Sequence, residues 1–440
     1  MNTLPLKTIY AREYQRTHFK KSVFPLFADL RFENELKDGA TVSWDYDDDA
    51  VADSLDSNDG YRIEGRKLTP ETLTVNQKPS HGFVIPGTQA IQDHRPTQQK
   101  WARKSMNVIF NKIDGDVLFD LVVNAGAKLD AADFGGSASA GIAVTTNNSA
   151  EVFAAAQRIL TNQDVIYDEN KVFQNNVKLD GGERYPVSAI PAELKEHLLL
   201  RVGFKDTGYA DKTMKSGFMG PMFGFNNIAS TALPFSFRIV FTGTPTNAAH
   251  ITLGSGPHTG ADATAVRITW ATTVSAAGQV RAQTNQATSV GHLVAFLNNP
   301  YGTVAGSYQG FNRDNLTRQQ RRLLDNLVAV DNEDGTAVVY MKGYGTRVVA
   351  QSDANGSIDR RKVHAVFGVS RSIGMIMQRT PAIEASAGNL ITTGQGTGFV
   401  GKQYLAWSLY GRKVFKTQRQ QLIDVQIEAT NFQEPASVLS

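Results

Sequence analysis

The longest amphipathic pattern in the chain covers residues 93–124. Apolar side chains recur there mostly at four-residue steps, which places them on one face of an α-helix. This stripe consists of Trp101, Ile109, Ile113, Val117 and Leu121. Gly115 argues against one unbroken helix, and Gly126 marks its end. Since about thirty helical residues would extend roughly 45 Å, the pattern predicts a long spine on which other elements pack.

The segment before this helix alternates in the manner of β-strands. Residues 41–46 predict a short strand, and an acidic loop rich in aspartate follows over residues 45–59. Apolar and polar positions alternate again at residues 73–75. Residues 78–82, which include Pro79 and Gly82, predict a turn that leads into the apolar residues 83–85. The pattern therefore predicts a long two-stranded excursion with a turn.

Two helices and one strand are predicted between residues 149 and 200. Residues 149–161 repeat apolar positions on one side, and Ser149 suits the N-cap because its hydroxyl can accept from a free backbone N–H. Residues 185–190 predict a buried strand. Pro191 then opens the second helix, as proline favours the first helical turn.

The character of the chain changes over residues 235–345. Glycine, threonine and alanine separate three β-type runs there, at residues 235–241, 265–270 and 337–340. Helices are predicted at residues 290–298 and 316–326. This segment predicts a β-rich domain inserted into a parent fold.

The parent fold resumes after the insertion. Residues 362–368, 404–412 and 422–428 predict strands, since apolar and polar positions alternate in them. Residues 385–403 contain many small residues and predict a flexible loop. A chain of 440 residues is long enough for several such compact units.

Composition excludes several classes of function. The chain has no cysteine, which excludes disulfides, thiolate metal sites and cysteine nucleophiles. The net charge of +3 is too small to indicate a general polyanion binder, although residues 12–21 and 402–419 are locally basic. The first 21 residues lack the apolar core of a secretion signal, and no apolar run reaches membrane-spanning length.

Two motifs suggest ligands, and both depart from their patterns. Residues 396–401 fit the dinucleotide pattern GxGxxG, but Gln403 follows Lys402 where a phosphate loop needs Ser or Thr. We interpret this match as chance. Within the acidic loop, Asp45, Asp47 and Asp49 have the spacing of calcium ligands, but Ala50 replaces the glycine that such a loop requires. We interpret it as a solvated loop, and leave open whether the stretch from Asp45 to Asp59 binds a cation.

No other residue type forms a convincing site. None of the eight histidines has a carboxylate or a second histidine at zinc-ligand spacing, and no nucleophile elbow is present. We therefore expect no catalytic, cofactor-binding or metal-binding residues, no cofactor and no enzymatic activity.

The glycine-rich segment 217–228 leads to a family. It reads Gly-Phe-Met-Gly-Pro-Met-Phe-Gly-Phe-Asn-Asn-Ile, with glycines between large apolar residues. This segment resembles the signature of major capsid proteins of tailed bacteriophages. The resemblance extends over most of the chain, through residues 70–92 as the extended loop, 93–124 as the spine helix and 149–200 as the start of the axial domain. Pro221, where the family often has an apolar residue, and the long insertion depart from the family pattern.

The resemblance implies an α+β phage capsid shell fold with an inserted β-rich domain. The expected parts are an N-terminal arm (1–40), an extended loop with flanking strands (41–92), a spine helix and peripheral domain (93–148), an axial domain (149–234), the inserted β-rich domain (235–345) and return strands that complete the axial and peripheral domains (346–440). The role of the insertion is left open between stabilising the subunit, contacting neighbours and decorating the surface.

The resemblance also implies a function without chemistry. Many copies of the chain, as hexamers and pentamers, would form an icosahedral head around double-stranded DNA that is held by nonspecific electrostatics. Further expected partners are portal, scaffolding or decoration proteins, with no membrane. Assembly would occur in the host cytoplasm, and the protein would reside in the virion. Deletion of residues 76–84 is expected to leave a folded subunit that cannot assemble.

Three alternatives remain at this point. A nanocompartment shell protein of the same fold would enclose cargo enzymes in place of a genome. A β-rich carbohydrate-binding protein would be built around residues 235–345. A nucleotide-dependent enzyme would use residues 396–402.

Overall fold

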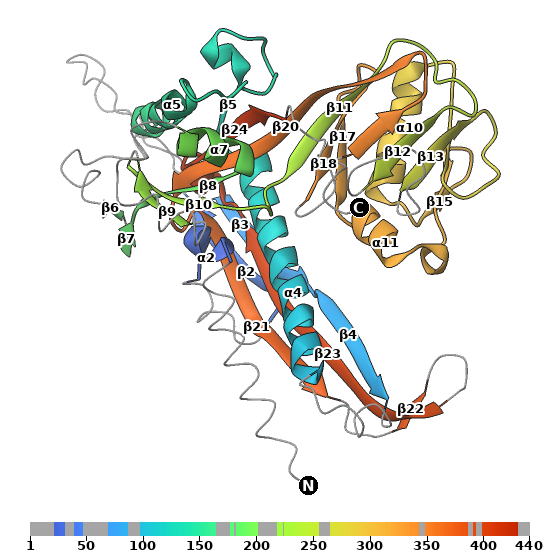
Figure 1. The fold of residues 1–440 in the computed structure, drawn as a ribbon, viewed down its shortest axis with the longest axis horizontal. Helices are drawn as coiled ribbons and strands as arrows, with labels where there is room; N and C mark the ends of the chain where they lie inside the picture. Colours follow the sequence, from blue (N-terminus) through green and yellow to red (C-terminus); the bar gives the residue numbers. More distant parts are fainter. Residues whose placement is uncertain are drawn as a thin grey trace, which may run out of the picture. The chain divides into compact units, whose positions relative to one another are not determined.

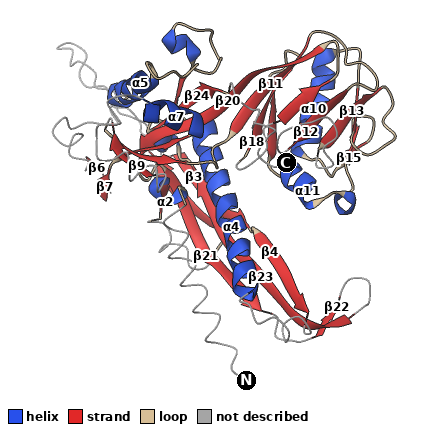
Figure 2. Cartoon of the chain, viewed as in Figure 1, coloured by secondary structure: helices blue, strands red, loops and turns tan. Residues whose placement is uncertain are grey.

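The computed structural model describes most of the chain (Figures 1 and 2). The chain forms two compact units. The described residues are 22–30, 39–46, 69–86, 97–163, 177–179, 182–200, 218–222, 224–254, 265–342, 348–385, 390–392 and 398–429. The first unit combines residues 1–113 with 370–421, and the second combines 114–369 with 422–440. The predicted α+β class is confirmed.

The first unit contains a sheet of seven described strands in the order β1-β21-β23-β3-β2, with β4 and β22 also paired to β23. Its elements are α2 (Phe24–Phe27), β1 (Ala28–Asp29), β2 (Thr41–Tyr46), β3 (Thr69–Gln77), β4 (Ser80–Pro86), β21 (Ile373–Ala385), β22 (Leu390–Thr392), β23 (Gly398–Lys413) and α12 (Lys416–Arg419). Phe24 and Phe27 are fully buried, so part of the predicted N-terminal arm belongs to the packed body of this unit.

The predicted turn at residues 78–82 is wrong. Val75 pairs with Gly411, and Ser80 to Pro86 pair with Trp407 to Gly401, so β3 and β4 follow β23 in the same antiparallel direction. Pro79 has no N–H to donate, but its carbonyl oxygen accepts from the backbone N–H of Ser408 at 3.2 Å. Proline therefore interrupts the ladder without reversing the chain. The 76–84 deletion would remove most of the paired strand β4, and its expected effect on assembly stays a prediction.

The predicted spine is helix α4 (Thr97–Val123), which Figure 2 shows as one long helix. Ile109, Ile113, Val117 and Leu121 are at most 1% exposed, which confirms the apolar stripe. The helix continues through Gly115 without a break. Tertiary packing along the stripe outweighs the roughly 1 kcal/mol penalty of an internal glycine.

The predicted loop at residues 385–403 is also partly wrong. Strand β21 extends to Ala385, β22 occupies Leu390–Thr392, and β23 begins at Gly398. Small residues carried no strand signal there, but pairing with β4 and β22 supplies the backbone partners.

The second unit is built on a sheet of nine described strands. Its main order is β17-β18-β11-β20-β8-β10-β9, with β24 joining β20 and β5 joining β24. The strands of this sheet are β5 (Ala127–Leu129), β8 (Pro186–Ile190), β9 (Phe218–Met222), β10 (Phe225–Ala229), β11 (Phe235–Phe241), β17 (Leu327–Asp331), β18 (Thr336–Met341), β20 (Gly356–Val369) and β24 (Leu422–Glu428).

Helices α5 (Ser149–Asn162) and α7 (Ala192–Leu200) supply part of one core of this unit. Phe153 of α5 packs edge-on against Phe367 and Phe225, with ring centroids 4.9 and 6.3 Å away. The N-cap prediction for Ser149 is wrong, because Asn148 occupies the N-cap and Ser149 is the first helical residue. The other small elements here are the 3₁₀ helix Ala131–Phe134 and the hairpin of β6 (Val177–Leu179) and β7 (Gly182–Arg184).

The signature segment folds as an antiparallel hairpin of β9 and β10. Gly224 lies in the turn with φ of +80°, a conformation that glycine adopts without strain.

The β-rich segment has a core of its own, in which Trp270, Phe296 and Val339 are at most 2% exposed. Its second sheet has six described strands. Its remaining elements are β12 (His250–Gly254), β13 (Val266–Ala271), β14 (Gln279–Arg281), α10 (Gln286–Asn298), β15 (Thr303–Val304), β16 (Tyr308–Gln309), the 3₁₀ helix Arg313–Asn315, α11 (Arg318–Leu324) and β19 (Val348–Gln351). β19 lies beyond residue 345 and pairs with β12, so strands of this segment continue past the predicted limit.

Candidate functional site

The first surface of interest is the face of the first unit's sheet that carries Gln403, Leu405 and Trp407, here called the outer face. Along β23 these residues alternate with Tyr404, Ala406 and Ser408, which are at most 9% exposed. Successive side chains of a strand point to opposite faces, so β23 has one buried face and one outer face.

Contacts with α4 and β4 define the buried face. Phe83 stacks on Tyr404 with ring centroids 5.0 Å apart, and it meets the ring of Trp101 edge-on at 5.9 Å. His81 on β4 bonds through Nδ1 with the Ser105 hydroxyl of α4 at 2.8 Å. The Phe83 ring thus packs against α4 and β23 within its own unit.

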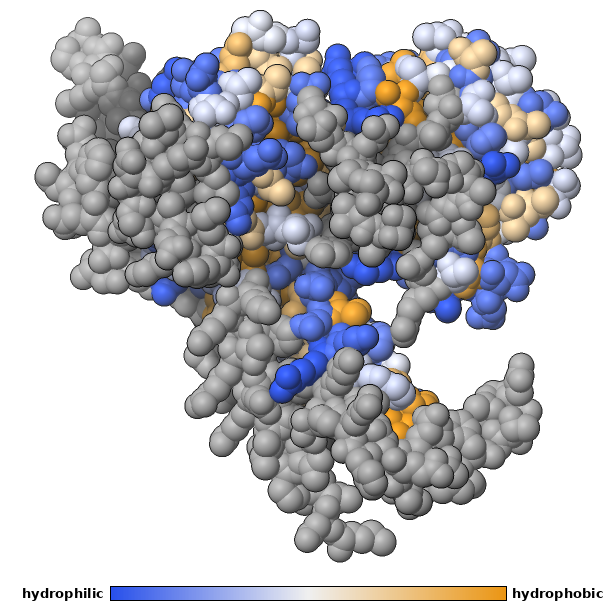
Figure 3. Space-filling view, viewed as in Figure 1, coloured by the Kyte–Doolittle hydropathy of each residue, from blue (hydrophilic) through white to orange (hydrophobic). Residues whose placement is uncertain are grey.

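The outer face retains exposed apolar side chains. Leu405 is 40% exposed, and Trp407 is half-buried beneath the Arg379 guanidinium, whose central carbon lies 3.9 Å from the ring centroid. Arg379 also pairs with Glu384. On the side drawn in Figure 3, the described residues present a mainly hydrophilic surface with small apolar patches. An exposed leucine beside a tryptophan on a regular strand is suited to bind another protein surface.

The second feature is a buried polar network in the second unit. Ser236 of β11 bonds with Nε2 of His364 on β20 at 2.7 Å, and Nδ1 of His364 bonds with Asp424 Oδ1 of β24 at 2.7 Å. Asp424 Oδ2 accepts from the Gln426 amide at 3.0 Å, and Gln426 accepts from Lys362 at 2.6 Å. Five side chains from three adjacent strands are thus linked in series.

This network includes the order of groups found in serine hydrolases, Ser–His–Asp. Ser236, His364 and Asp424 are each at most 2% exposed. A substrate could reach the Ser236 hydroxyl only if the strands separated. The arrangement therefore satisfies buried polar groups, as interiors require, and offers no open catalytic site.

Burial shifts two neighbouring groups in opposite directions. Desolvation lowers the pKa of Lys362 below its ordinary value, while the Asp424 carboxylate partly opposes that shift. Desolvation raises the pKa of the Tyr340 phenol, and the Asp424 charge raises it further. No local pattern predicts this network, because Ser236 and Asp424 lie 128 and 60 residues from His364.

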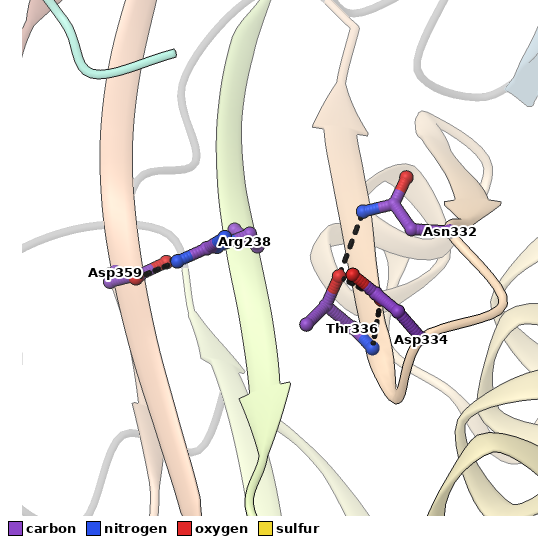
Figure 4. Close-up of polar contacts among 5 residues, drawn as sticks. All are labelled: Arg238, Asn332, Asp334, Thr336 and Asp359. Carbon is purple, nitrogen blue, oxygen red and sulfur yellow. Dashed lines mark hydrogen bonds and ion pairs between the residues drawn. The ribbon is translucent and has the colours of Figure 1, made fainter. Parts of the chain in front are cut away.

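A third polar group joins β11 to β20 nearer the surface (Figure 4). Arg238 donates to both oxygens of Asp359, at 2.8 and 2.5 Å, and this pairing raises the pKa of Arg238. In the turn between β17 and β18, Asp334 accepts from the N–H and hydroxyl of Thr336, and Asn332 donates to that hydroxyl (Figure 4). These contacts hold strands and turns in place.

The described residues include only parts of the acidic loop (45–59) and of the glycine-rich motif (396–402), and those parts are β-strands. Residues 47–59 of the acidic loop lie outside the described residues, and Asp45 belongs to β2. Gly396 and Thr397 also lie outside them, while residues 398–402 form the start of β23 and pair with β22 and β4. A strand thus stands where a dinucleotide site needs a helix N-terminus. The basic residues 12–21 lie outside the described part as well.

The described residues provide neither a cluster of metal ligands nor a helix suited to span a membrane. No group of three His, Asp or Glu side chains in them could hold a metal ion. None of their helices is both long and apolar enough to cross a membrane.

Comparison with known proteins gives a likeness of fold. No family model and no curated protein matches the chain. A solved structure titled Mycobacterium phage Che8 is similar with a TM-score of 0.45 and 11% identity, covering 92% of this chain and 90% of its own. The capsid of Cyanophage P-SCSP1u gives 0.44 and 8%, covering 93% and 89%. The mature capsid of bacteriophage PhiM1 gives 0.45 and 8%, covering 93% and 88%.

Proposed function

We propose that this chain is the shell-forming subunit of a tailed-phage head, a major capsid protein that assembles as hexamers and pentamers. The observation that carries the proposal is the first unit: a regular sheet whose one face is buried against α4, while Leu405 and Trp407 are left on the outer face. This element exposes strand side chains that suit contact with another copy of the chain.

The proposal is a function without catalysis. The Ser–His–Asp arrangement, the most enzyme-like group in the described residues, is enclosed by its own strands. Its hydrogen bonds account for each of its polar atoms within the fold, so no reaction is needed to explain it.

The finer expectations belong to the same proposal. The enclosed material would be double-stranded DNA held by nonspecific contacts of basic segments with phosphate. Portal, scaffolding or decoration proteins would be further partners, and assembly would take place in the host cytoplasm. Residues 402–419, which include Lys413 and Arg419, supply one basic segment.

Electron microscopy of the purified full chain tests the proposal directly. We expect closed icosahedral shells, with DNA inside particles taken from infected cells. Shells that enclose proteins and no DNA would instead establish a nanocompartment. A chain that stays monomeric at all concentrations would refute the shell function.

A substitution on the outer face tests the surface assigned to assembly. Leu405→Glu changes a side chain that is 40% exposed, so we expect the subunit to fold and remain soluble but to form no shells. Val304→Glu is the matched control, because Val304 is 47% exposed on β15 of the β-rich segment. Normal shells from Leu405→Glu, or equal loss from both variants, would exclude the outer face as the assembly surface.

A further inference from the structure

Strand β17 is the edge strand at one end of the strand order β17-β18-β11-β20-β8-β10-β9. Among the described strands it pairs with β18 alone, residue by residue from Leu327 with Met341 to Asp331 with Ala337. The other side of such a strand carries backbone N–H and C=O groups that can pair with a strand of another molecule. Whether another molecule can pair with β17 therefore depends on what covers the edge that faces away from β18.

Asn298, the last residue of α10, occupies this edge. Its side-chain amide donates to the Ala329 carbonyl oxygen at 2.9 Å, and its amide oxygen accepts from the Ala329 N–H at 2.9 Å. A residue on an adjacent antiparallel strand would make the same pair of hydrogen bonds to Ala329. The asparagine side chain thus takes the place of a neighbouring strand.

The helix that presents Asn298 stays close to β17 over two turns. A Cβ atom on Gly291 would lie 3.2 Å from Oδ2 of Asp331, so this glycine permits the close approach. Asn298 is itself exposed at the surface, which places its two hydrogen bonds where a second molecule would otherwise arrive.

The composition of β17 would make an uncovered edge prone to pair with strands of other molecules. Its run Leu327-Val328-Ala329-Val330 is uncharged and mostly β-branched or aliphatic, and Val330 is 48% exposed. Short uncharged segments of this kind form intermolecular sheets readily when their backbone is free. The partner that best fits an open β17 is the same strand in a second copy, since an antiparallel pair of identical strands is self-complementary.

We propose that Asn298 determines the specificity of self-association by closing β17 to a second copy of the chain. Copies then meet only through other surfaces. The inference deepens the proposed function and rests on it only for the identity of the final particle, because edge closure is measurable on the free subunit.

Hydrogen exchange of the full-length chain tests the closure itself. In Asn298→Ala the Ala329 amide loses its acceptor, and we expect its exchange to become roughly 5- to 10-fold faster, the change that loss of one net hydrogen bond gives. Asn315→Ala, a substitution of an exposed asparagine in the 3₁₀ turn before α11, is the matched control and should leave the Ala329 amide unchanged. Equal exchange in Asn298→Ala and the parent chain would overturn the proposal.

Light scattering after size-exclusion chromatography tests the consequence. Asn298→Ala should self-associate at concentrations where the parent subunit and Asn315→Ala do not. Adding Val330→Lys should abolish this association through charge repulsion at the edge while leaving the Ala329 amide fast. Association that persists with Val330→Lys, or none in Asn298→Ala, would refute edge closure. If the parent chain forms no shells yet these results hold, only the shell function fails.

Discussion

Replacing Asp424 by asparagine probes how far the buried network supports the second unit. The carboxylate is 2% exposed and accepts from His364 at 2.7 Å and Gln426 at 3.0 Å. Asparagine preserves the shape but has one acceptor oxygen, so its NH₂ group must face one of the two partner nitrogens. Loss of one charge-assisted bond with an unsatisfied buried donor costs about 3 kcal/mol.

This cost is large compared with a total stability of roughly 5–15 kcal/mol. For a unit of this size it should lower the thermal midpoint by roughly 6–12 °C. Calorimetry of the unassembled subunit gives the midpoint, and hydrogen exchange of peptides from β20 and β24 locates the loss.

The matched control is Asp359→Asn, the same chemical change in the same sheet. Its partner is Arg238, and the two side chains are 24% and 40% exposed, so water screens the pair. We expect a loss of about 1 kcal/mol or less. If Asp424→Asn cost no more than Asp359→Asn, the network would not be a source of stability and the reasoning from burial would be wrong.

Two further predictions concern close packing and alkaline pH. Gly411→Ala should lower the free energy of unfolding in urea by about 1–3 kcal/mol, because the new Cβ would clash with the Thr74 carbonyl oxygen of β3. Gly82→Ala is the control and should be nearly neutral, since its Cβ would meet nothing closer than 3.5 Å. Burial and the hydrogen bond to Asp325 raise the pKa of Tyr301 above its ordinary value of about 10. A raised pKa in the folded state gives stability that is present below pH 10 and is lost as pH rises above it. Tyr301→Phe should therefore flatten the fall of thermal midpoint above about pH 10, and an unchanged slope would contradict this assignment.

The spacing of apolar residues correctly predicted helix α4 and strand β24. The predicted helix at 93–124 is α4 at Thr97–Val123, and the predicted strand 422–428 is β24 with the same limits. In both, the apolar spacing follows one face of an element that is buried along its length.

The errors arise where a distant partner decides the structure. Pro79 and Gly82 carry turn chemistry, but pairing with β23, more than 300 residues away, keeps the chain extended. Asn298 and Ala329 meet across 31 residues through side-chain and backbone groups that no periodicity records. Leu405 was within reach of sequence reasoning, since its place in the alternating run 404–412 puts it opposite the buried Tyr404.

Strand pairing at the base of the β-rich segment bears on its role, which the sequence left open. Phe235 on β11 pairs directly with Val363 on β20, so the chain leaves and returns at adjacent positions of one sheet, as an inserted domain requires. In Figure 1, β20 runs as one strand between β24 and β11, so the insertion shares its first strands with the parent fold.

Contacts on β18 indicate that the insertion stabilises the subunit, and we propose this role for it. Tyr340 meets Phe119 of α4 edge-on with centroids 5.8 Å apart, and Lys342 lies 3.6 Å from the buried Asp116 carboxylate. Tyr340→Ala removes a ring that covers both α4 and the His364 network while leaving the rest of the insertion intact. It should lower the thermal midpoint of the subunit by a few degrees, since loss of a large half-buried ring costs about 1–3 kcal/mol. A midpoint equal to that of the parent chain would instead favour decoration of the surface, because an appended module can change without effect on the body that carries it.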